Sequence, residues 1–186
     1  MKESKKIYLF DLFIFAISVL SLLNVFLLVL GLFYPLWSLI ITIIVLAIGV
    51  FVFKIKINIQ DKRFGFLFLV IIVLALALRF TPNLYLTGGQ DQGTYVSMSK
   101  QYESNHSLYK KDELRDSFSE DLREIYDKGN VFLGLKFADK ETSEYTMPFY
   151  PVFPSWMGIF GTTLGSDNRI YALTFFSILS IVGIAI

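Results

Sequence analysis

The sequence contains no cysteine and a single histidine, His106. The first absence excludes a disulfide framework and thiolate metal sites, and the second argues against a zinc site made of protein ligands alone. The net charge is only +1, so the chain has no overall positive field of the kind that attracts nucleic acid. We therefore expect neither a protein-only metal centre nor a nucleic-acid partner. Apolar residues, in contrast, make up 54% of the chain.

Three long apolar segments occupy the first 80 residues, at 7–34, 36–53 and 64–80. Each is close to the roughly 20 residues that a helix needs to cross about 30 Å of hydrocarbon. In lipid a segment must satisfy its own backbone hydrogen bonds, so each is predicted to be a transmembrane helix. Residues 170–186 form a fourth apolar run without a polar flank after it. We interpret it as the truncated start of another span in a larger polytopic protein, the alternative being a small protein with a short last helix.

Basic residues predict the orientation of these spans. Lys2, Lys5 and Lys6 precede the first span, and residues 54–63, with four basic side chains, follow the second. Short basic segments stay on the cytoplasmic side, and two crossings separate these two, so both are predicted to be cytoplasmic. The first run is too long for a signal peptide and lacks a cleavage site, so it is expected to remain as an anchor. The chain is thus predicted to be an integral protein of the cell membrane, with residues 81–169 extracytoplasmic.

This extracytoplasmic loop is too long for a structureless connector, which favours a functional role. Apolar residues recur in it at helical spacing in two places, and they alternate in another, as strand residues do. A proline- and aromatic-rich stretch before the fourth run is typical of the membrane interface. The predicted elements are amphipathic helices over 90–103 and 112–128, a β-hairpin over 131–137 and 144–147, and an interfacial helix over 154–164. The predicted fold class is mainly α: membrane helices with one long, partly folded loop.

The most informative motif is Gly-Gly-Gln-Asp-Gln-Gly-Thr-Tyr-Val at residues 88–96, just past the third span. Asp91 opens the predicted helix, where an aspartate is an ordinary N-cap. A carboxylate at the boundary of water and membrane could also remove a proton from an acceptor hydroxyl as a general base. As a further alternative, it could help to hold a divalent cation, the one cofactor that we consider. These roles are compatible, because a capping position fixes a side chain rigidly.

Two basic residues near this motif are candidate phosphate partners. Arg79 closes the third span, and it either reaches the interface as snorkelling arginines do or binds phosphate oxygens through its guanidinium. Lys100 lies nine residues beyond Asp91 on the same predicted helix and offers a point charge for the same purpose. An acid and two bases near one membrane face form a stronger pattern than any of them alone.

A known family shows the same order of motifs. Here a span ending Leu-Ala-Leu-Arg-Phe at residue 80 is followed by Asp-Gln-Gly-Thr-Tyr at 91–95, and the loop then leads to Phe-Tyr-Pro-Val-Phe-Pro-Ser-Trp at 149–156. Over residues 64–165 this resembles the GT-C class of polyprenyl-phosphate-sugar-dependent membrane glycosyltransferases. The similarity is greatest to the dolichyl-phosphate-mannose-protein mannosyltransferase and aminoarabinose-transferase type.

The resemblance implies an activity: transfer of a sugar from a polyprenyl phosphate to an acceptor hydroxyl on a protein, a glycolipid or a wall polymer. It assigns the role of catalytic base to Asp91. Gln92 stands where the family usually has a glutamate, Tyr95 matches the family's aromatic, and Tyr150-Pro151 match a stretch near the lipid-facing side of the active site. The candidate substrate-binding residues are therefore Arg79, Gln92, Tyr95, Lys100, Tyr150 and Pro151.

The competing hypothesis is a non-enzymatic membrane protein, either a transporter subunit or a ligand-binding sensor. It explains the spans and the loop, but not the joint placement of Arg79, Asp91, Tyr95 and the Tyr150-Pro151 segment. A transporter is also expected to have a polar or broken helix at mid-membrane, and these spans show only Asn24 at depth. A small structural partner protein is the third alternative, if the chain ends at Ile186.

Overall fold

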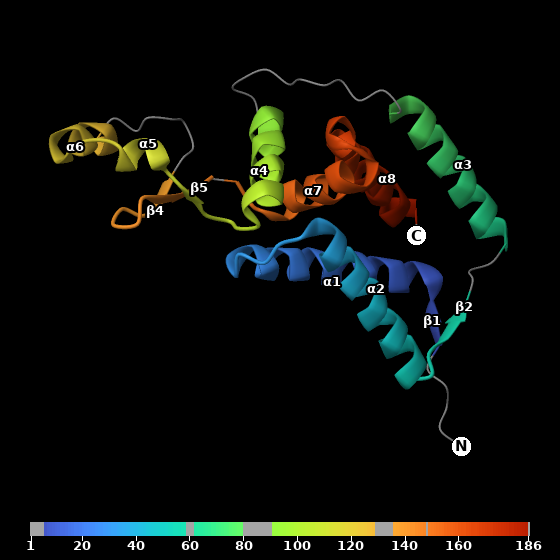
Figure 1. Ribbon diagram of the computed structural model, residues 1–186. Helices are drawn as coiled ribbons and strands as arrows, with labels where there is room; N and C mark the ends of the chain where they lie inside the picture. Colours follow the sequence, from blue (N-terminus) through green and yellow to red (C-terminus); the bar gives the residue numbers. More distant parts are fainter. Residues whose placement is uncertain (1–5, 59–61, 80–90, 129–135, 148, 186) are drawn as a thin grey trace.

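The computed structural model describes residues 6–58, 62–79, 91–128, 136–147 and 149–185, and these are mostly helical (Figure 1). The helices are α1 Leu9–Val29, α2 Pro35–Val52, α3 Lys62–Arg79, α4 Asp91–Asn105, α5 Glu113–Asp116, α6 Glu120–Lys128, α7 Val152–Leu164 and α8 Tyr171–Ala185, with a 3-10 turn, η1, over Ser166–Ile170. The strands are β1 Lys6–Tyr8, β2 Lys56–Asn58, β3 Lys110–Lys111, β4 Lys136–Asp139 and β5 Glu144–Thr146.

Helices α1 and α2 are long and apolar enough to cross a membrane, as predicted. The first ends at Val29, five residues before the predicted Tyr34, because Gly31 adopts a left-handed φ of 69° that a helix cannot continue through. Pro35 then occupies the first turn of α2. N–H groups in that turn have no partner within the helix, so the lack of an N–H in proline costs no hydrogen bond there. The predicted third and fourth runs also form helices, α3 and α8, which lie against each other.

A short parallel strand pair joins the segment before α1 to the segment after α2. Strand β1 pairs with β2 in the register Lys6–Lys56, Ile7–Ile57 and Tyr8–Asn58. The sequence analysis did not predict it, because three-residue strands are too short for a readable alternation and their partners lie 50 residues apart. The pairing places Lys6 beside Lys56 of the basic segment that follows α2.

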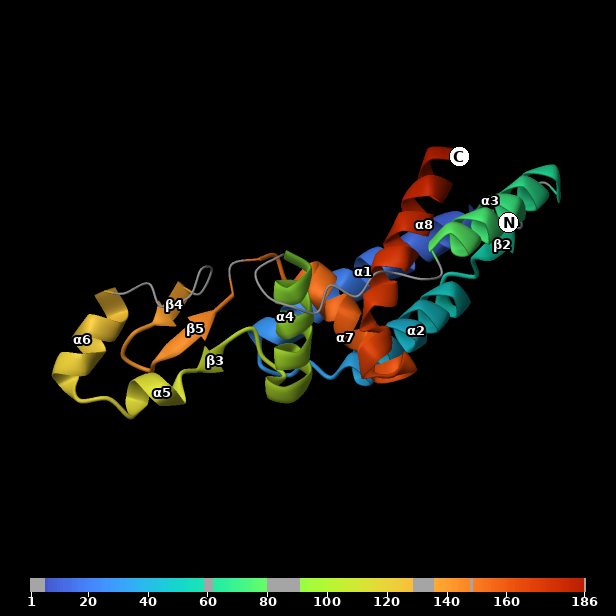
Figure 2. The same cartoon turned by 90° about the horizontal axis from the view of Figure 1, so that it is seen from above.

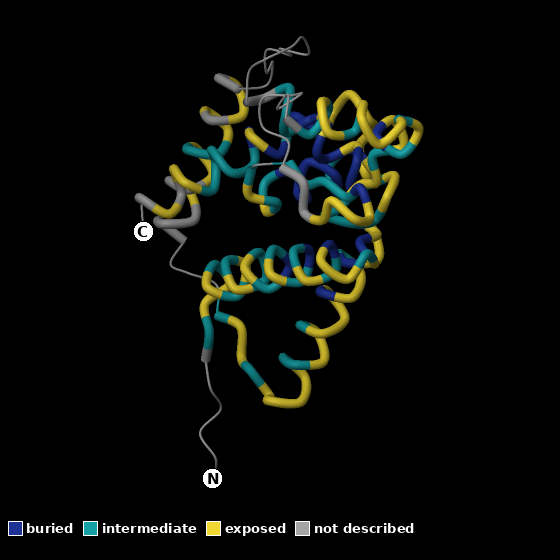
Figure 3. The backbone as a smooth tube through the Cα atoms, turned by 90° about the vertical axis from the view of Figure 1, so that its left-hand side faces the viewer, coloured by how far each residue is buried: buried dark blue, intermediate teal, exposed yellow. Residues whose placement is uncertain are grey.

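The best-packed region lies where α1, α4, α7 and η1 meet, and we call it the helix junction. Buried residues gather there, whereas α1 and α2 expose most of their apolar surface elsewhere (Figure 3). Asn24 of α1 donates from Nδ2 to Ser155 Oγ of α7 at 3.4 Å, and Trp156 Nε1 donates to Ser21 Oγ of α1 at 2.9 Å. Asn24 thus bonds a neighbouring helix.

Helix α7 differs from the interfacial helix predicted over 154–164. It forms two residues earlier, and Pro154 to Ile159 are buried against α1, α2 and α4. Its glycines and aromatic rings are as well suited to close helix packing as to a membrane interface. Tertiary contacts decide between these two environments, and the sequence pattern does not.

The second helix of the loop, predicted as one element over 112–128, is two helices. Helix α5 ends at Asp116 and α6 begins at Glu120. Arg123 of α6 donates to the Arg115 and Asp116 carbonyls at 3.1 and 2.7 Å, which satisfies the end of α5 and turns the chain. The predicted apolar stripe is not buried as one continuous face, because Leu114, Leu122 and Ile125 are exposed.

The predicted β-hairpin is present. Strand β4 pairs antiparallel with β5 over 136–139 and 144–146, while residues 131–135 of the prediction lie outside the described residues. An unpredicted strand, β3, pairs with the other edge of β5. Residues 110–128 and 136–146 together form a peripheral module that projects away from the helix junction (Figure 2).

Candidate functional site

Helix α4 begins at the predicted catalytic residue. Asp91 is its first residue and Gln92 its second, one residue later than the predicted start at 90, so Asp91 lies in the first turn and is not the N-cap that the sequence suggested. Arg79 is the last residue of α3. The side chains of Arg79, Asp91 and Gln92, and the whole of 80–90, lie outside the described residues. Their predicted roles therefore rest on backbone position alone.

Tyr95 joins this helix to the aromatic and proline-rich segment. Its ring meets Phe149 edge-on at a centroid distance of 5.0 Å and Phe153 at 5.4 Å. Such aromatic pairs contribute about 0.5–1.5 kcal/mol beyond the burial of their area. The first turns of α4 are thereby held against the start of α7, which brings together two motifs that stand more than 50 residues apart in the chain.

The Tyr150–Pro151 pair lies at the start of α7. Pro151 is its N-cap residue, and its carbonyl accepts a hydrogen bond from Ser155 N at 3.0 Å. The adjoining Tyr150 is 89% exposed, so its ring and hydroxyl are open to a ligand. Beside the Tyr95–Phe149 contact, the site thus presents one free aromatic ring.

Lys100 is exposed on α4, but its position does not favour the predicted partnership with Asp91. At about 3.6 residues per turn, nine residues make two and a half turns. The two Cα atoms therefore lie on opposite sides of the helix. Of the predicted residues, the structure brings Tyr95 together with the segment that carries Tyr150 and Pro151, and it places Lys100 apart from them.

A buried arginine that was not among the predicted site residues anchors α4 from its other end. Arg169 of η1 is 3% exposed. Its Nη1 donates to Ser99 Oγ at 2.6 Å, while Nη2 lies 3.2 Å from Glu103 Oε2 and donates to Ser166 Oγ at 2.9 Å. Its Nε donates to the Ser166 carbonyl at 2.8 Å. We call this group the Arg169 clamp, since it ties α4 to the segment that leads into α8.

The Arg169 clamp has room to form because its ion pair lies against Gly161 of α7, which has no side chain. A Cβ atom on Gly161 would lie 2.8 Å from Glu103 Oε1 and 3.2 Å from Arg169 Cζ. Real Cβ atoms essentially never approach a neighbour that closely. The glycine spacing in residues 158–165 was the available sequence signal, because small residues allow close helix packing.

The single histidine serves the same junction. His106 has a left-handed φ of 58°, and its Nδ1 lies 2.8 Å from the Phe33 carbonyl. Its ring stacks on Tyr34 at 3.9 Å. The end of α4 is in this way fixed to the turn between α1 and α2.

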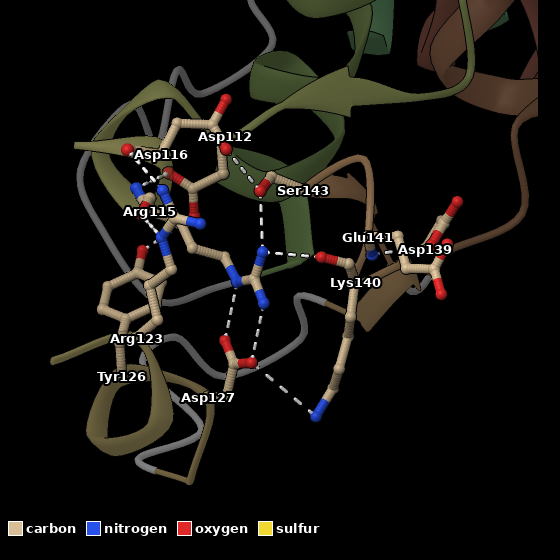
Figure 4. Close-up of polar contacts among 10 residues, drawn as sticks. All are labelled: Asp112, Arg115, Asp116, Arg123, Tyr126, Asp127, Asp139, Lys140, Glu141 and Ser143. Carbon is tan, nitrogen blue, oxygen red and sulfur yellow. Dashed lines mark hydrogen bonds and ion pairs between the residues drawn. The ribbon is translucent and has the colours of Figure 1, made fainter. Parts of the chain in front are cut away.

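The peripheral module contains a second buried arginine, Arg115, in a dense polar cluster (Figure 4). Its Nε and Nη2 donate to the two carboxylate oxygens of Asp127, each at 2.8 Å. Its Nη1 donates to the Lys140 carbonyl and to Ser143 Oγ, each at 2.7 Å. Ser143 Oγ donates in turn to Asp116.

These interactions favour the charged form of two carboxylates of the module, those of Asp116 and Asp127. The hydrogen bond from Arg115 lowers the pKa of Asp127, and hydrogen bonds from Lys111 and then Ser143 lower the pKa of Asp116. A carboxylate with a lowered pKa is a poor proton acceptor, so neither suits general-base catalysis. We interpret this cluster as structural.

Within the described ranges, no three His, Cys, Asp or Glu side chains gather closely enough to hold a metal ion. The divalent cation considered for Asp91 remains a prediction, since that side chain is outside these ranges. No protein-family model, curated protein or solved structure matches this chain.

Proposed function

We propose that this protein is a membrane glycosyltransferase that moves a sugar from a polyprenyl-phosphate donor to an acceptor hydroxyl. The observation that carries the proposal is the contact of Tyr95 with Phe149 and Phe153. It brings the helix that starts at Asp91 next to the Tyr150–Pro151 segment, as the family resemblance requires. Helix α7 lies beside α1 and α2, which are long and apolar enough to cross a membrane.

In the proposed reaction the acceptor hydroxyl oxygen attacks the anomeric carbon of the donor sugar. The bond between that carbon and the phosphate oxygen breaks, and the phosphate leaves with the electron pair. Asp91 takes the proton of the hydroxyl as general base. Inversion at the anomeric carbon is expected from the resemblance.

The leaving phosphate needs positive charge near it. Arg79 is the better of the two predicted partners, because Lys100 lies across the helix from Asp91. Arg169 is engaged in the clamp, so its proposed role is to hold α4 in place. Tyr150 offers an exposed ring for contact with the donor or the acceptor.

The proposed topology puts this site on the extracytoplasmic face, with the N-terminus in the cytoplasm. The parallel pairing of Lys6 with Lys56 supports one part of it, since the two basic segments lie together at one end of the α1–α2 unit. The positive-inside rule then makes that end cytoplasmic.

The test is the Asp91→Asn variant of the native protein in its membrane, supplied with a panel of polyprenyl-phosphate hexoses and pentoses. Asparagine has the size of aspartate and can accept hydrogen bonds at the start of the helix, but it cannot act as the base that takes the proton. Release of polyprenyl phosphate should fall by about 100-fold or more, the usual contribution of a general base. The matched control is Asp139→Asn, an exposed aspartate in the hairpin, which should keep full activity.

Two results would overturn the proposal. One is unchanged release by Asp91→Asn, which would leave Asp91 with a structural role alone at the start of α4. The other is no release from any donor by the wild-type protein, which would favour the non-enzymatic alternative.

A further inference from the structure

A groove of about 470 Å³ lies between α1 and α2, at the end of the unit away from their connecting turn. Its lining is apolar and comes from three elements: Leu12, Phe13 and Ala16 of α1, Ala47 and Val50 of α2, and Ile57 of β2. Helices α1 and α2 diverge toward the end at which β1 and β2 lie (Figure 1).

Small side chains form part of the groove. Ala16 and Ala47 line it from facing helices and leave space between the larger side chains around them. Phe13 is held in position by an edge contact with Phe175 of α8, at a centroid distance of 6.3 Å. The groove is thus bounded by residues that other packing contacts keep in place.

The chemistry of the lining determines what can fill this space. Water needs two to four polar partners in a cavity, and this lining offers almost none. The volume falls within the roughly 300–1,000 Å³ of sites that hold one small organic molecule. Since α1 and α2 are apolar on their outer surfaces as well, hydrocarbon is the material around them in a membrane.

Positive charge marks the end of the groove at which Ile57 lies. Lys54 and Lys56 are both exposed within three residues of Ile57. The β1–β2 register places Lys6 directly opposite Lys56. A basic cluster at a membrane surface attracts anionic lipid by about 1 kcal/mol per residue.

We propose that the α1–α2 groove is a binding site for one anionic phospholipid of the surrounding bilayer. A hydrocarbon chain occupies the groove, and the phosphate of the headgroup binds Lys54 and Lys56. The site requires that α1 and α2 cross a membrane. It is independent of the proposed transferase activity.

The experiment uses the protein in nanodiscs that contain equal amounts of phosphatidylglycerol and phosphatidylcholine, with retained lipids counted by native mass spectrometry. The wild-type protein should retain one phosphatidylglycerol. The Ala47→Phe variant fills the groove and should lose it, whereas Val45→Phe, on the opposite side of α2, should keep it.

A second variant tests the headgroup and leaves the packed helices unchanged. Lys54→Gln combined with Lys56→Gln should lower retention of phosphatidylglycerol by about tenfold or more. Lys110→Gln, an exposed lysine of the peripheral module, is the control. Equal retention of both lipids by the wild-type protein, or unchanged retention in the double lysine variant, would refute the proposal even if Ala47→Phe fails to fold.

Discussion

The helix junction and the peripheral module each contain a buried arginine, but the two arginines have different tasks. In the junction, Arg169 lies among helices that also share two apolar clusters, one around Trp156 and Met157 and the other around Tyr102 and Phe33. In the module, neither cluster includes a described residue of α5 or α6, and the contacts described there centre on Arg115 and its partners.

The comparison teaches that an ion pair matters most where little else holds the structure. A small unit that buries few apolar side chains has little hydrophobic stabilisation to offset its conformational entropy. The module should therefore depend on Arg115 more than the junction depends on Arg169. The predictions below test that difference.

The largest effect is expected for Arg115→Met. This change keeps much of the side-chain volume but leaves the Asp127 carboxylate without its partner, which should destabilise the module locally by about 3 kcal/mol. Amide hydrogen exchange should show the loss in α5 and β5, with protection in α4 and α7 unchanged. Lys140→Met is the control, because it removes only an exposed amine 3.9 Å from Asp127. Equal protection in both variants would mean that another contact holds the module.

Gly161→Ala should have the next largest effect, and it should affect the junction alone. The added Cβ pushes the flexible Glu103 carboxylate away from Arg169, which weakens the clamp. Alanine favours a helix over glycine by about 1 kcal/mol, so the net destabilisation should be about 1 kcal/mol. Exchange in α4 and η1 should accelerate, while the module stays unchanged. In Gly49→Ala, the matched helical control, the new Cβ meets no described atom within 4 Å and should be tolerated. If the two variants were alike, the clamp would contribute nothing to the junction.

Acid should destabilise the peripheral module before it destabilises the helix junction. The folded state holds the pKa of Asp116 and Asp127 below their ordinary value of 3.8. Their contribution to stability is therefore present above about pH 4 and is lost as the pH falls through that value toward the folded pKa. Exchange rates corrected for intrinsic chemistry should show the module opening first between pH 5 and pH 3. The order would be wrong if α4 opened at a higher pH than β5.

Lys111→Gln should have the smallest effect. The Lys111–Asp116 pair is short at 2.8 Å, but the lysine side chain is 63% exposed and solvent screens it. Thermal unfolding and local exchange should match the wild type. A clear loss in the module would show that exposed pairs also support it, and would weaken the central place given to Arg115.

Much of the secondary structure could be predicted from the sequence. The apolar runs gave four helices, the Asp91 motif gave the start of α4, and the alternation near residue 137 gave one hairpin. The break between α5 and α6 was missed, since it depends on Arg123 reaching back to the carbonyls at the end of α5. The β1–β2 and β3–β5 pairs were missed because their strands have only two or three residues.

Some features of the candidate site could likewise be predicted from the sequence, and others needed the fold. Asp91, Tyr95 and Tyr150 were chosen from local motifs, and the contact of Tyr95 with Phe149 needed the fold, because residues more than 50 positions apart carry no local signal of their proximity. The Arg169 clamp was hidden for the same reason. The relation of Lys100 to Asp91, in contrast, could have been read from helical geometry alone.

The sequence by itself determined which segments are apolar helices and that Pro35 starts a new one, because hydrophobic runs and proline act over a few residues. Only the tertiary structure decided which helices meet, which arginines are buried and where α1 and α2 leave a groove. Those features depend on the approach of side chains from distant segments, and the energies of packing and of buried ion pairs exist only once these segments are in contact.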